Sequence, residues 1–235
     1  MQTLRSILFT VFLFVSVIPA SIFIVLLRPF GANASRAVVM RWVIIVTAAC
    51  RILCRLDFSV EGKQNIPATN CVVFLKHSSA YETITQWLLI PRQTWVLKRE
   101  LMWVPFLGWA LACLHPIAIN RNAGRAAVEQ VIKQGRSRLA EGLWVMIFPE
   151  GTRMRPGETR RYGVSGTLLA QRVGTLILPI AHNAGDYWPR RGWRKRPGTV
   201  RFAIGPPVDP AGRDPREVNA QIQAWIEQKV AELRG

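Results

Sequence analysis

One uncharged apolar segment constrains this chain more than any other feature. The sequence "SILFTVFLFVSVIPASIFIVLL" runs from Ser6 to Leu27 without a charged residue. As a helix it is long enough to cross the roughly 30 Å of hydrocarbon in a bilayer. A cleaved signal peptide is the alternative, because "ANA" at 32–34 resembles a cleavage site. Signal peptides have shorter apolar cores and a basic start, so we favour a retained membrane anchor.

The residues around this segment predict its orientation. Arg28, Arg36 and Arg41 follow it, whereas only Arg5 precedes it. By the positive-inside rule, a spanning helix would place the body of the protein in the cytoplasm. The next apolar stretch, residues 38–53, is interrupted by arginines, which favours a helix lying in the interface or the second arm of a helical hairpin.

The charge balance of the 235 residues predicts an anionic partner. The formal net charge is +17, which suits nucleic acid, an acidic membrane surface or a phosphorylated substrate. The densest basic cluster, residues 187–198, interleaves arginines with Trp188 and Trp193. Such a loop suits lipid headgroups, although a solvated basic loop fits equally well. The four cysteines lack metal-ligand spacing and indicate reduced thiols, and the three dispersed histidines predict no metal site.

Short apolar runs alternate with helical patterns through the rest of the chain. This alternation predicts an α/β fold, a mostly parallel or mixed sheet flanked by helices. An N-terminal membrane-associated helical pair (1–56) precedes the predicted main domain (57–235). The expected strands lie at 71–75, 94–98, 116–120, 143–148, 176–181 and 199–205, and helices are expected at 123–142 and after a cap at Asp214.

The stretch "FLKHSSAYET" places an imidazole and a carboxylate where a buried strand ends. His77 and Glu82 are five residues apart, so on one helix they would face different directions. They can meet if His77 lies in the turn before a helix and Glu82 lies on its first turn. That pair would serve as a general base and its orienting carboxylate. The alternative interpretation is a serine helix cap followed by an incidental surface charge.

A second polar motif, "FPEGTR" at 148–153, also follows an apolar run. Gly151 would let backbone amides approach a ligand, Thr152 can bind an oxygen, and Arg153 offers a planar fork for a phosphate. Glu150 is expected to organise the loop through hydrogen bonds. A plain strand-turn-helix junction is the alternative. Ligands of α/β sheets bind beyond the carboxyl ends of strands, which is where both motifs are predicted to lie.

These motifs together resemble those of the glycerophospholipid acyltransferases, in particular the bacterial 1-acyl-glycerol-3-phosphate acyltransferases. The resemblance covers residues 60–210 and rests on four blocks: "HSSAYE", with Glu82 where the family usually has Asp; "KRELMWVPFLGW" with "HPIAINR"; "FPEGTR"; and "LILPIA". It implies that His77 is the general base and Glu82 its partner. It also implies that Lys98, Arg121 and Arg153 hold the phosphate of the acceptor.

The resemblance implies transfer of an acyl chain to the sn-2 hydroxyl of 1-acyl-glycerol-3-phosphate, giving phosphatidic acid. The donor would be a thioester of acyl carrier protein or coenzyme A, with no cofactor or metal. Backbone amides near Gly151 or within the first motif would stabilise the oxyanion of this reaction. The expected location is the bacterial inner membrane, with the catalytic domain on the cytoplasmic side.

Two alternatives to this activity stay open. A related lysolipid such as a lyso-ornithine lipid is an alternative acceptor. A membrane-anchored nucleic-acid-binding protein would explain the charge, but the sequence carries no recognisable binding module, and its basic residues cluster at strand ends and beside tryptophan.

Overall fold

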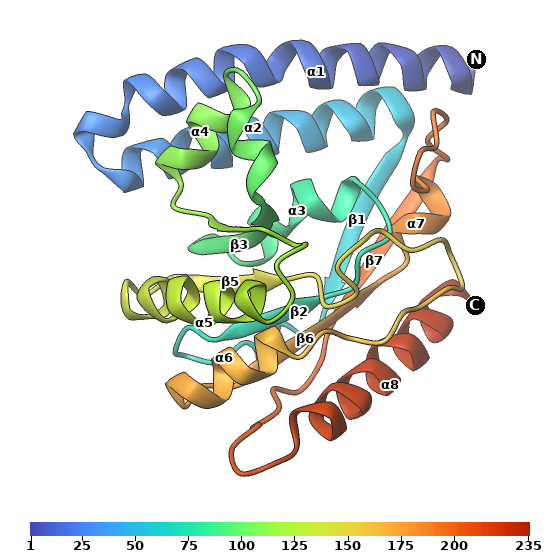
Figure 1. Cartoon of the computed structure of the whole chain (residues 1–235). Helices are drawn as coiled ribbons and strands as arrows, with labels where there is room; N and C mark the ends of the chain where they lie inside the picture. The colour runs from blue at the N-terminus through green and yellow to red at the C-terminus, as the bar shows by residue number, and fades with distance from the viewer.

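The computed structural model describes residues 1–235, and its strands form one seven-stranded sheet in the order β1-β7-β6-β2-β5-β3-β4 (Figure 1). The strands are β1 (Leu56–Glu61), β2 (Val72–Leu75), β3 (Gln93–Lys98), β4 (Ile117–Ile119), β5 (Trp144–Ile147), β6 (Ile177–His182) and β7 (Gly198–Ile204). Neighbouring strands are parallel except β6 and β7, which are antiparallel. The predicted mixed α/β sheet is confirmed, and β1 is an edge strand that the sequence analysis did not predict.

Helices cover both faces of this sheet. They are α1 (Gln2–Leu26), α2 (Ala32–Cys54), α3 (Tyr81–Leu89), α4 (Leu107–Cys113), α5 (Arg125–Ala140), α6 (Ser165–Val173), α7 (Ala184–Tyr187) and α8 (Pro215–Arg234), with short 3-10 turns η1 (Arg28–Phe30), η2 (Lys63–Asn65) and η3 (Arg99–Trp103). The predicted cap of the last helix is confirmed, because the Asp214 carboxylate accepts the amide hydrogens of Arg216 and Glu217 at 2.7 and 3.3 Å.

The central strand β2 shows why these strands are apolar throughout. Successive side chains of a strand point to opposite faces. Val72 and Phe74 lie in the core beneath α5, α6 and α8, whereas Val73 and Leu75 lie in the core beneath α1, α2 and α3. A strand buried on both faces has no polar side, so it reads as a continuous apolar run.

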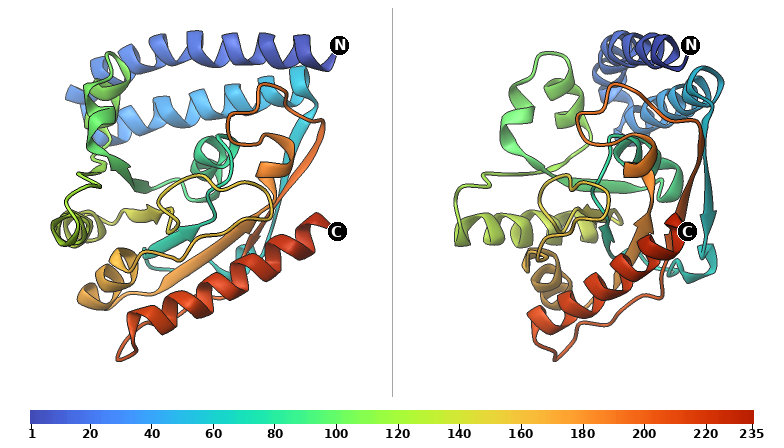
Figure 2. Two further views of the ribbon diagram at one scale, coloured as in Figure 1. Left: turned by 45° about the vertical axis from the view of Figure 1, so that its right-hand side comes forward. Right: turned by 90° about the vertical axis from the view of Figure 1, so that its right-hand side faces the viewer.

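The N-terminal helices form an antiparallel pair, as Figures 1 and 2 show, with α2 between α1 and the rest of the molecule. Both are long and apolar enough to cross a membrane. Phe9 of α1 and Val46 of α2 share a buried cluster with sheet residues such as Leu178. The opposite face of α1 leaves large apolar side chains exposed, among them Leu4, Phe14 and Phe23. This exposed face indicates membrane association, and the division of the chain at residue 56 stays a prediction.

The two tryptophans of the basic loop at 187–198 lie in different environments. Trp188 is buried and packs edge-on against Phe9 of α1, with ring centroids 5.7 Å apart. Lys195 is buried beside it and donates to the Thr10 hydroxyl of α1. Trp193 is 77% exposed. The loop therefore fastens the start of α1 to the body, and of its two tryptophans only Trp193 could reach a lipid headgroup.

Candidate active site

The first polar motif lies where β2 ends and α3 begins. Lys76 and His77 follow the strand, and Ser79 accepts the amide hydrogen of Tyr81 at 3.0 Å at the start of the helix. This turn brings His77 Nδ1 to 2.9 Å from Oε1 of Glu82. The same carboxylate oxygen accepts the amide hydrogens of Ser78 and Ser79 at 3.0 and 2.9 Å. The strand-to-helix switch thus brings the predicted pair together.

The environment of Glu82 favours its ionised form. The side chain is fully buried, and burial alone would raise its pKa. The hydrogen bond from His77, the nearby His182 and the amide of Ser79 outweigh this effect and hold the pKa of Glu82 below its usual value. An ionised carboxylate can only accept, so Nδ1 of His77 carries the hydrogen and Nε2 is left to accept a proton. The imidazole stacks on Phe148 with ring centroids 4.0 Å apart.

The second motif is joined to the first by a buried polar network. Glu150 accepts the amide hydrogen of His77 at 2.8 Å and lies 2.7 Å from Lys76 Nζ. Lys76 also pairs with Glu227 of α8 at 2.6 Å. The amide of Met154 donates to the His77 carbonyl at 2.8 Å. Burial raises the pKa of Glu150 to about 7, and Lys76 opposes that shift. The network fixes both loops around the backbone of His77.

Two of the three predicted phosphate-binding residues reach the site. Arg121 and Arg153 line the same cavity as His77. Arg121 also donates to the carbonyl of Gly151 at 2.7 Å, which ties it to the second motif. Lys98 lies outside the cavity lining, about half exposed, with Nζ 3.8 Å from Glu100. The structure therefore brings Arg121 and Arg153 together with His77 but leaves Lys98 at the periphery.

The backbone amides of the two motifs are mostly committed to the protein itself. Those of His77, Ser78 and Ser79 donate to Glu150 and Glu82. Gly151 has φ +69°, which glycine adopts without strain, and its amide donates to the Phe148 carbonyl. The amides of Thr152 and Arg153 have no acceptor within the protein. The amides of His77, Ser78 and Ser79 are therefore not available to an oxyanion, and the amides of Thr152 and Arg153 are candidates for that role.

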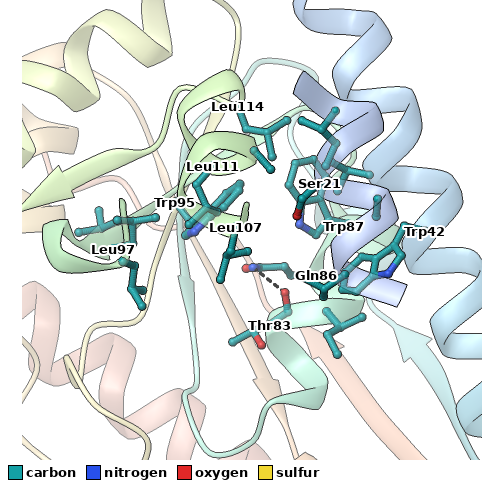
Figure 3. Close-up of a pocket in the computed structure, with 18 of the residues that line it drawn as sticks. Ser21, Trp42, Thr83, Gln86, Trp87, Trp95, Leu97, Leu107, Leu111 and Leu114 are labelled. Atoms are coloured by element: carbon teal, nitrogen blue, oxygen red, sulfur yellow. Dashed lines mark hydrogen bonds between the residues drawn. The ribbon is translucent and has the colours of Figure 1, made fainter. Parts of the chain in front are cut away.

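An apolar cavity of about 360 Å³ extends from these polar groups (Figure 3). His77, Arg121 and Arg153 line it, and the exposure of Arg121 with the partial exposure of the other two places them at its mouth. Its walls come from α1, α2, α3, β3, η3 and α4, with side chains that include Ile24, Trp42, Trp87, Trp95, Leu107 and Leu111. Polar side chains are few along these walls. A cavity with a polar mouth and long apolar walls suits an amphiphile with one acyl chain.

Comparisons with known proteins agree with this geometry. The family model described as Acyltransferase matches residues 57–183. The 1-acyl-sn-glycerol-3-phosphate acyltransferase of Pseudomonas aeruginosa is 42% identical to this chain, with 99% of this chain and 92% of that protein covered. This chain belongs to the acyltransferase family. The protein of the same name from Borreliella burgdorferi is 30% identical over 139 residues, which cover 58% of this acyltransferase and 55% of that protein.

A solved structure supports the fold of this acyltransferase. The crystal structure of the 1-acyl-sn-glycerophosphate (LPA) acyltransferase PlsC from Thermotoga maritima superposes with a TM-score of 0.80, covering 100% of this chain and 98% of that one. At 24% sequence identity, this likeness concerns the fold alone. It extends over the N-terminal helical pair as well as the sheet, so the pair is part of the shared architecture.

Sequence reasoning missed several residues of this acyltransferase site. Lys76 is buried and charged directly after an apolar strand, a position that could have marked it as paired. Glu227 gave no local signal, because it joins the site from a helix at the other end of the chain. The cavity wall from α1 carries no motif, and the wall residues of α4 beyond the block "KRELMWVPFLGW" carry none either. The side chains of these walls are mostly apolar, and only the fold brings them to the site.

Proposed function

We propose that this acyltransferase moves an acyl group from a thioester to the sn-2 hydroxyl of 1-acyl-sn-glycerol-3-phosphate, forming phosphatidic acid. The observation that carries the proposal is the buried His77–Glu82 pair at the mouth of an apolar cavity, beside Arg121 and Arg153. The names of the relatives from Pseudomonas aeruginosa and Borreliella burgdorferi support this acceptor. The nature of the donor carrier is open, since acyl carrier protein and coenzyme A present the same thioester.

In the proposed chemistry, His77 acts as the general base. Its Nε2 takes the proton of the acceptor hydroxyl as the oxygen attacks the thioester carbonyl. Glu82 holds the tautomer and stabilises the imidazolium that forms. The amides of Thr152 and Arg153 are free to stabilise the oxyanion. When the carbon–sulfur bond breaks, the imidazolium returns its proton to the departing thiolate, and the histidine is ready for another cycle.

The acceptor phosphate is assigned to Arg121 and Arg153. A guanidinium presents paired donors that match two phosphate oxygens, and it stays charged at any physiological pH. Both arginines belong to the lining that includes His77, so a phosphate bound there would keep the glycerol hydroxyl near Nε2. Lys98 is proposed to act only at longer range, by attracting anionic substrates to the surface.

The proposed membrane placement rests on how the N-terminal pair packs. One face of α2, including Val39, Val43 and Val46, is buried against the body, and α1 lies along α2. A helix packed along its length on a polar domain cannot cross a bilayer without that domain. We propose that α1 lies in one leaflet, on the cytoplasmic side of the inner membrane, where its exposed apolar face contacts lipid.

An acceptor panel tests this proposal. Purified full-length protein would be offered lysophosphatidic acid, lysophosphatidylcholine and a lyso-ornithine lipid, each with acyl carrier protein and coenzyme A thioesters. We expect kcat/KM for lysophosphatidic acid to exceed the others by at least about a hundredfold, because an acceptor without a phosphate leaves the charge-assisted hydrogen bonds of both arginines unmade. A preference for the lyso-ornithine lipid would overturn the acceptor assignment. No transfer to any lysolipid would overturn the activity.

A further inference from the structure

The segment between β3 and β4 carries an exposed cluster of large apolar side chains. Trp103 is 71% exposed, Trp109 57%, and Val104 and Phe106 are each 41% exposed. We call these four side chains the aromatic surface. No charged residue occurs from Leu101 to Leu114. Large aromatic groups clustered in this way on a protein surface mark an interaction site.

The backbone that presents the aromatic surface is unusually constrained. Phe106 has φ +61° and ψ −58°, a conformation that residues with side chains rarely adopt. The amides of Leu107 and Gly108 donate to the carbonyls of Pro105 and Val104, both at 2.7 Å. A side chain on Gly108 would lie 2.1 Å from the Met102 carbonyl oxygen, so only glycine fits there. The tight turn holds these aromatic groups outward although burying them would be favourable.

The same segment has a second apolar face that turns inward. Leu101, Leu107, Ala110, Leu111 and Leu114 line the cavity described above. None of the four side chains of the aromatic surface lines it. The η3–α4 segment is therefore a thin wall, with the cavity on one side and the aromatic surface on the other.

The aromatic surface continues the exposed apolar face of α1. Figure 1 shows α4 and the loop before it beside the end of α1, and Ile24 of α1 shares a buried cluster with Ala110 and Leu114. Arg28, in the turn between α1 and α2, lies 2.8 Å from His115 Nε2 at the end of α4. Phe30 of that turn is 79% exposed. The helical pair and the η3–α4 segment thus form one apolar surface.

We infer that the aromatic surface inserts into the interfacial layer of the membrane that holds α1. Tryptophan side chains prefer this layer, because the indole has an apolar body and one polar donor. Lys98 and Arg99, which with Glu100 come just before the uncharged stretch, are exposed, as residues beside lipid phosphates would be. The uncharged composition argues for a bilayer rather than for a charged carrier protein. The wall of the cavity would then face lipid, so an acyl chain could reach the cavity from the bilayer, a step that rests on the proposed function.

Insertion can be measured without any activity. Trp103→Phe/Trp109→Phe would be compared with wild type in vesicles containing phosphatidylglycerol and lipids brominated near the headgroup, which quench nearby tryptophans. We expect this variant to lose a large part of the quenching seen in wild type, because it removes two of the three exposed tryptophans and leaves only Trp193. The control is Trp225→Phe on α8, which packs on the opposite face of the sheet and should leave quenching unchanged. Equal quenching in wild type and Trp103→Phe/Trp109→Phe would overturn the inference.

A second experiment separates the membrane from other partners. In Trp103→Ser/Phe106→Asn/Trp109→Ser, asparagine is used because it tolerates positive φ. We expect kcat/KM to fall at least about tenfold for acceptor embedded in vesicles, from the lost aromatic burial, and to stay within about twofold for a short-chain soluble acceptor. If kcat/KM fell only with acyl carrier protein thioesters and not with coenzyme A thioesters, the aromatic surface would instead be a binding site for acyl carrier protein. If the wild-type protein were inactive on every lysolipid, the proposed function would be wrong. The quenching experiment would still test membrane insertion, because it needs no activity.

Discussion

The two ends of the cavity are built on different principles. At the polar end, His77, Glu82 and Glu150 come from two loops, and each is held by hydrogen bonds of 3.0 Å or less. At the apolar end, the walls come from α1, α2, α3, β3, η3 and α4 and are held mainly by packing, with few side-chain hydrogen bonds such as the one from Trp42 Nε1 to Ser16 Oγ at 3.1 Å. Hydrogen-bond geometry is lost when one atom moves, whereas packing adjusts to small changes of shape. Substitutions should therefore be costly at the polar end and graded at the apolar end.

The largest effect is expected for His77→Ala. Loss of a general base should lower kcat by roughly two to four orders of magnitude. The protein should stay folded, because His77 contributes its backbone, not its ring, to the network with Glu150. Steady-state kinetics of purified protein would check this.

The matched control for that substitution is His115→Asn. His115 has φ +56°, which asparagine tolerates, and it lies outside the cavity lining. Its kcat should stay within about threefold of wild type, as for a substitution remote from the chemistry. A His77→Ala enzyme as active as this control would refute the assigned base.

The next effect concerns Glu82. Glu82→Gln keeps the size but loses the charge that stabilises the imidazolium, and kcat should fall by about two orders of magnitude or more. Glu82→Asp keeps the charge but is one methylene shorter, while three donors are positioned for the longer side chain. We expect it to lose about tenfold, the cost of one strained charged hydrogen bond. A fully active Glu82→Asp enzyme would show that the turn moves to accommodate the shorter side chain, so the polar end would not be rigid.

Glu150 gives the polar end a pH dependence of stability. Its folded pKa is about 7 against a usual value of 4.5, so between these values the folded state holds a proton that the unfolded state has lost. Its contribution is complete below about pH 4.5 and is lost as the pH rises through about 7, by at most about 1.4 kcal/mol per pH unit. The Glu150→Gln variant cannot ionise at this position, so its stability should fall less than that of wild type between pH 5 and 8.

Urea unfolding of wild type and the Glu150→Gln variant in detergent would measure that difference. The free energies of unfolding of the two proteins will differ at any pH, because the neutral amide beside Lys76 lacks the charge of the native pair. The prediction therefore concerns only how much each free energy of unfolding changes with pH. If the wild-type protein instead became more stable relative to the variant as the pH rises, Lys76 would be keeping the Glu150 carboxylate ionised despite its burial.

The contrast between the two ends also explains what the sequence could predict. His77 and Glu82 lie within six residues, and "FPEGTR" is contiguous, so local pattern was enough to select them. The strands of the central sheet were visible as apolar runs, whereas β1, "LDFSVE", lies at the sheet edge and carries charges. Lys98 and Arg121 looked equivalent in sequence, because only the path of η3 and α4 decides which one reaches the cavity. The two tryptophans of the 187–198 loop looked equivalent for the same reason.

A smaller effect is expected for the phosphate-binding arginines. Arg153→Ala should raise KM for lysophosphatidic acid by about tenfold with little change in kcat, because a phosphate contact is equally present in the ground and transition states. Arg153→Lys should recover only part of this loss, since the planar fork is gone. Arg161→Ala, an exposed arginine on the same loop, is the control and should leave KM unchanged. An unchanged KM in Arg153→Ala would give Arg153 a structural role.

The smallest effect should come from the apolar end. Ala110 is buried on α4 and lines the cavity, so Ala110→Leu adds three carbons inside it. We expect kcat/KM for lysophosphatidic acid with a long acyl chain to fall by about tenfold, the lower end of what one methylene in an apolar pocket discriminates, while lysophosphatidic acid with a short acyl chain is used as well as by wild type. Ala112→Leu, on the exposed side of the same helix, should leave kcat/KM unchanged for both the long-chain and the short-chain substrate. Equal losses on long-chain and short-chain acceptors would mean that the substitution disturbs the polar end, so the two ends of the cavity would not be independent of each other.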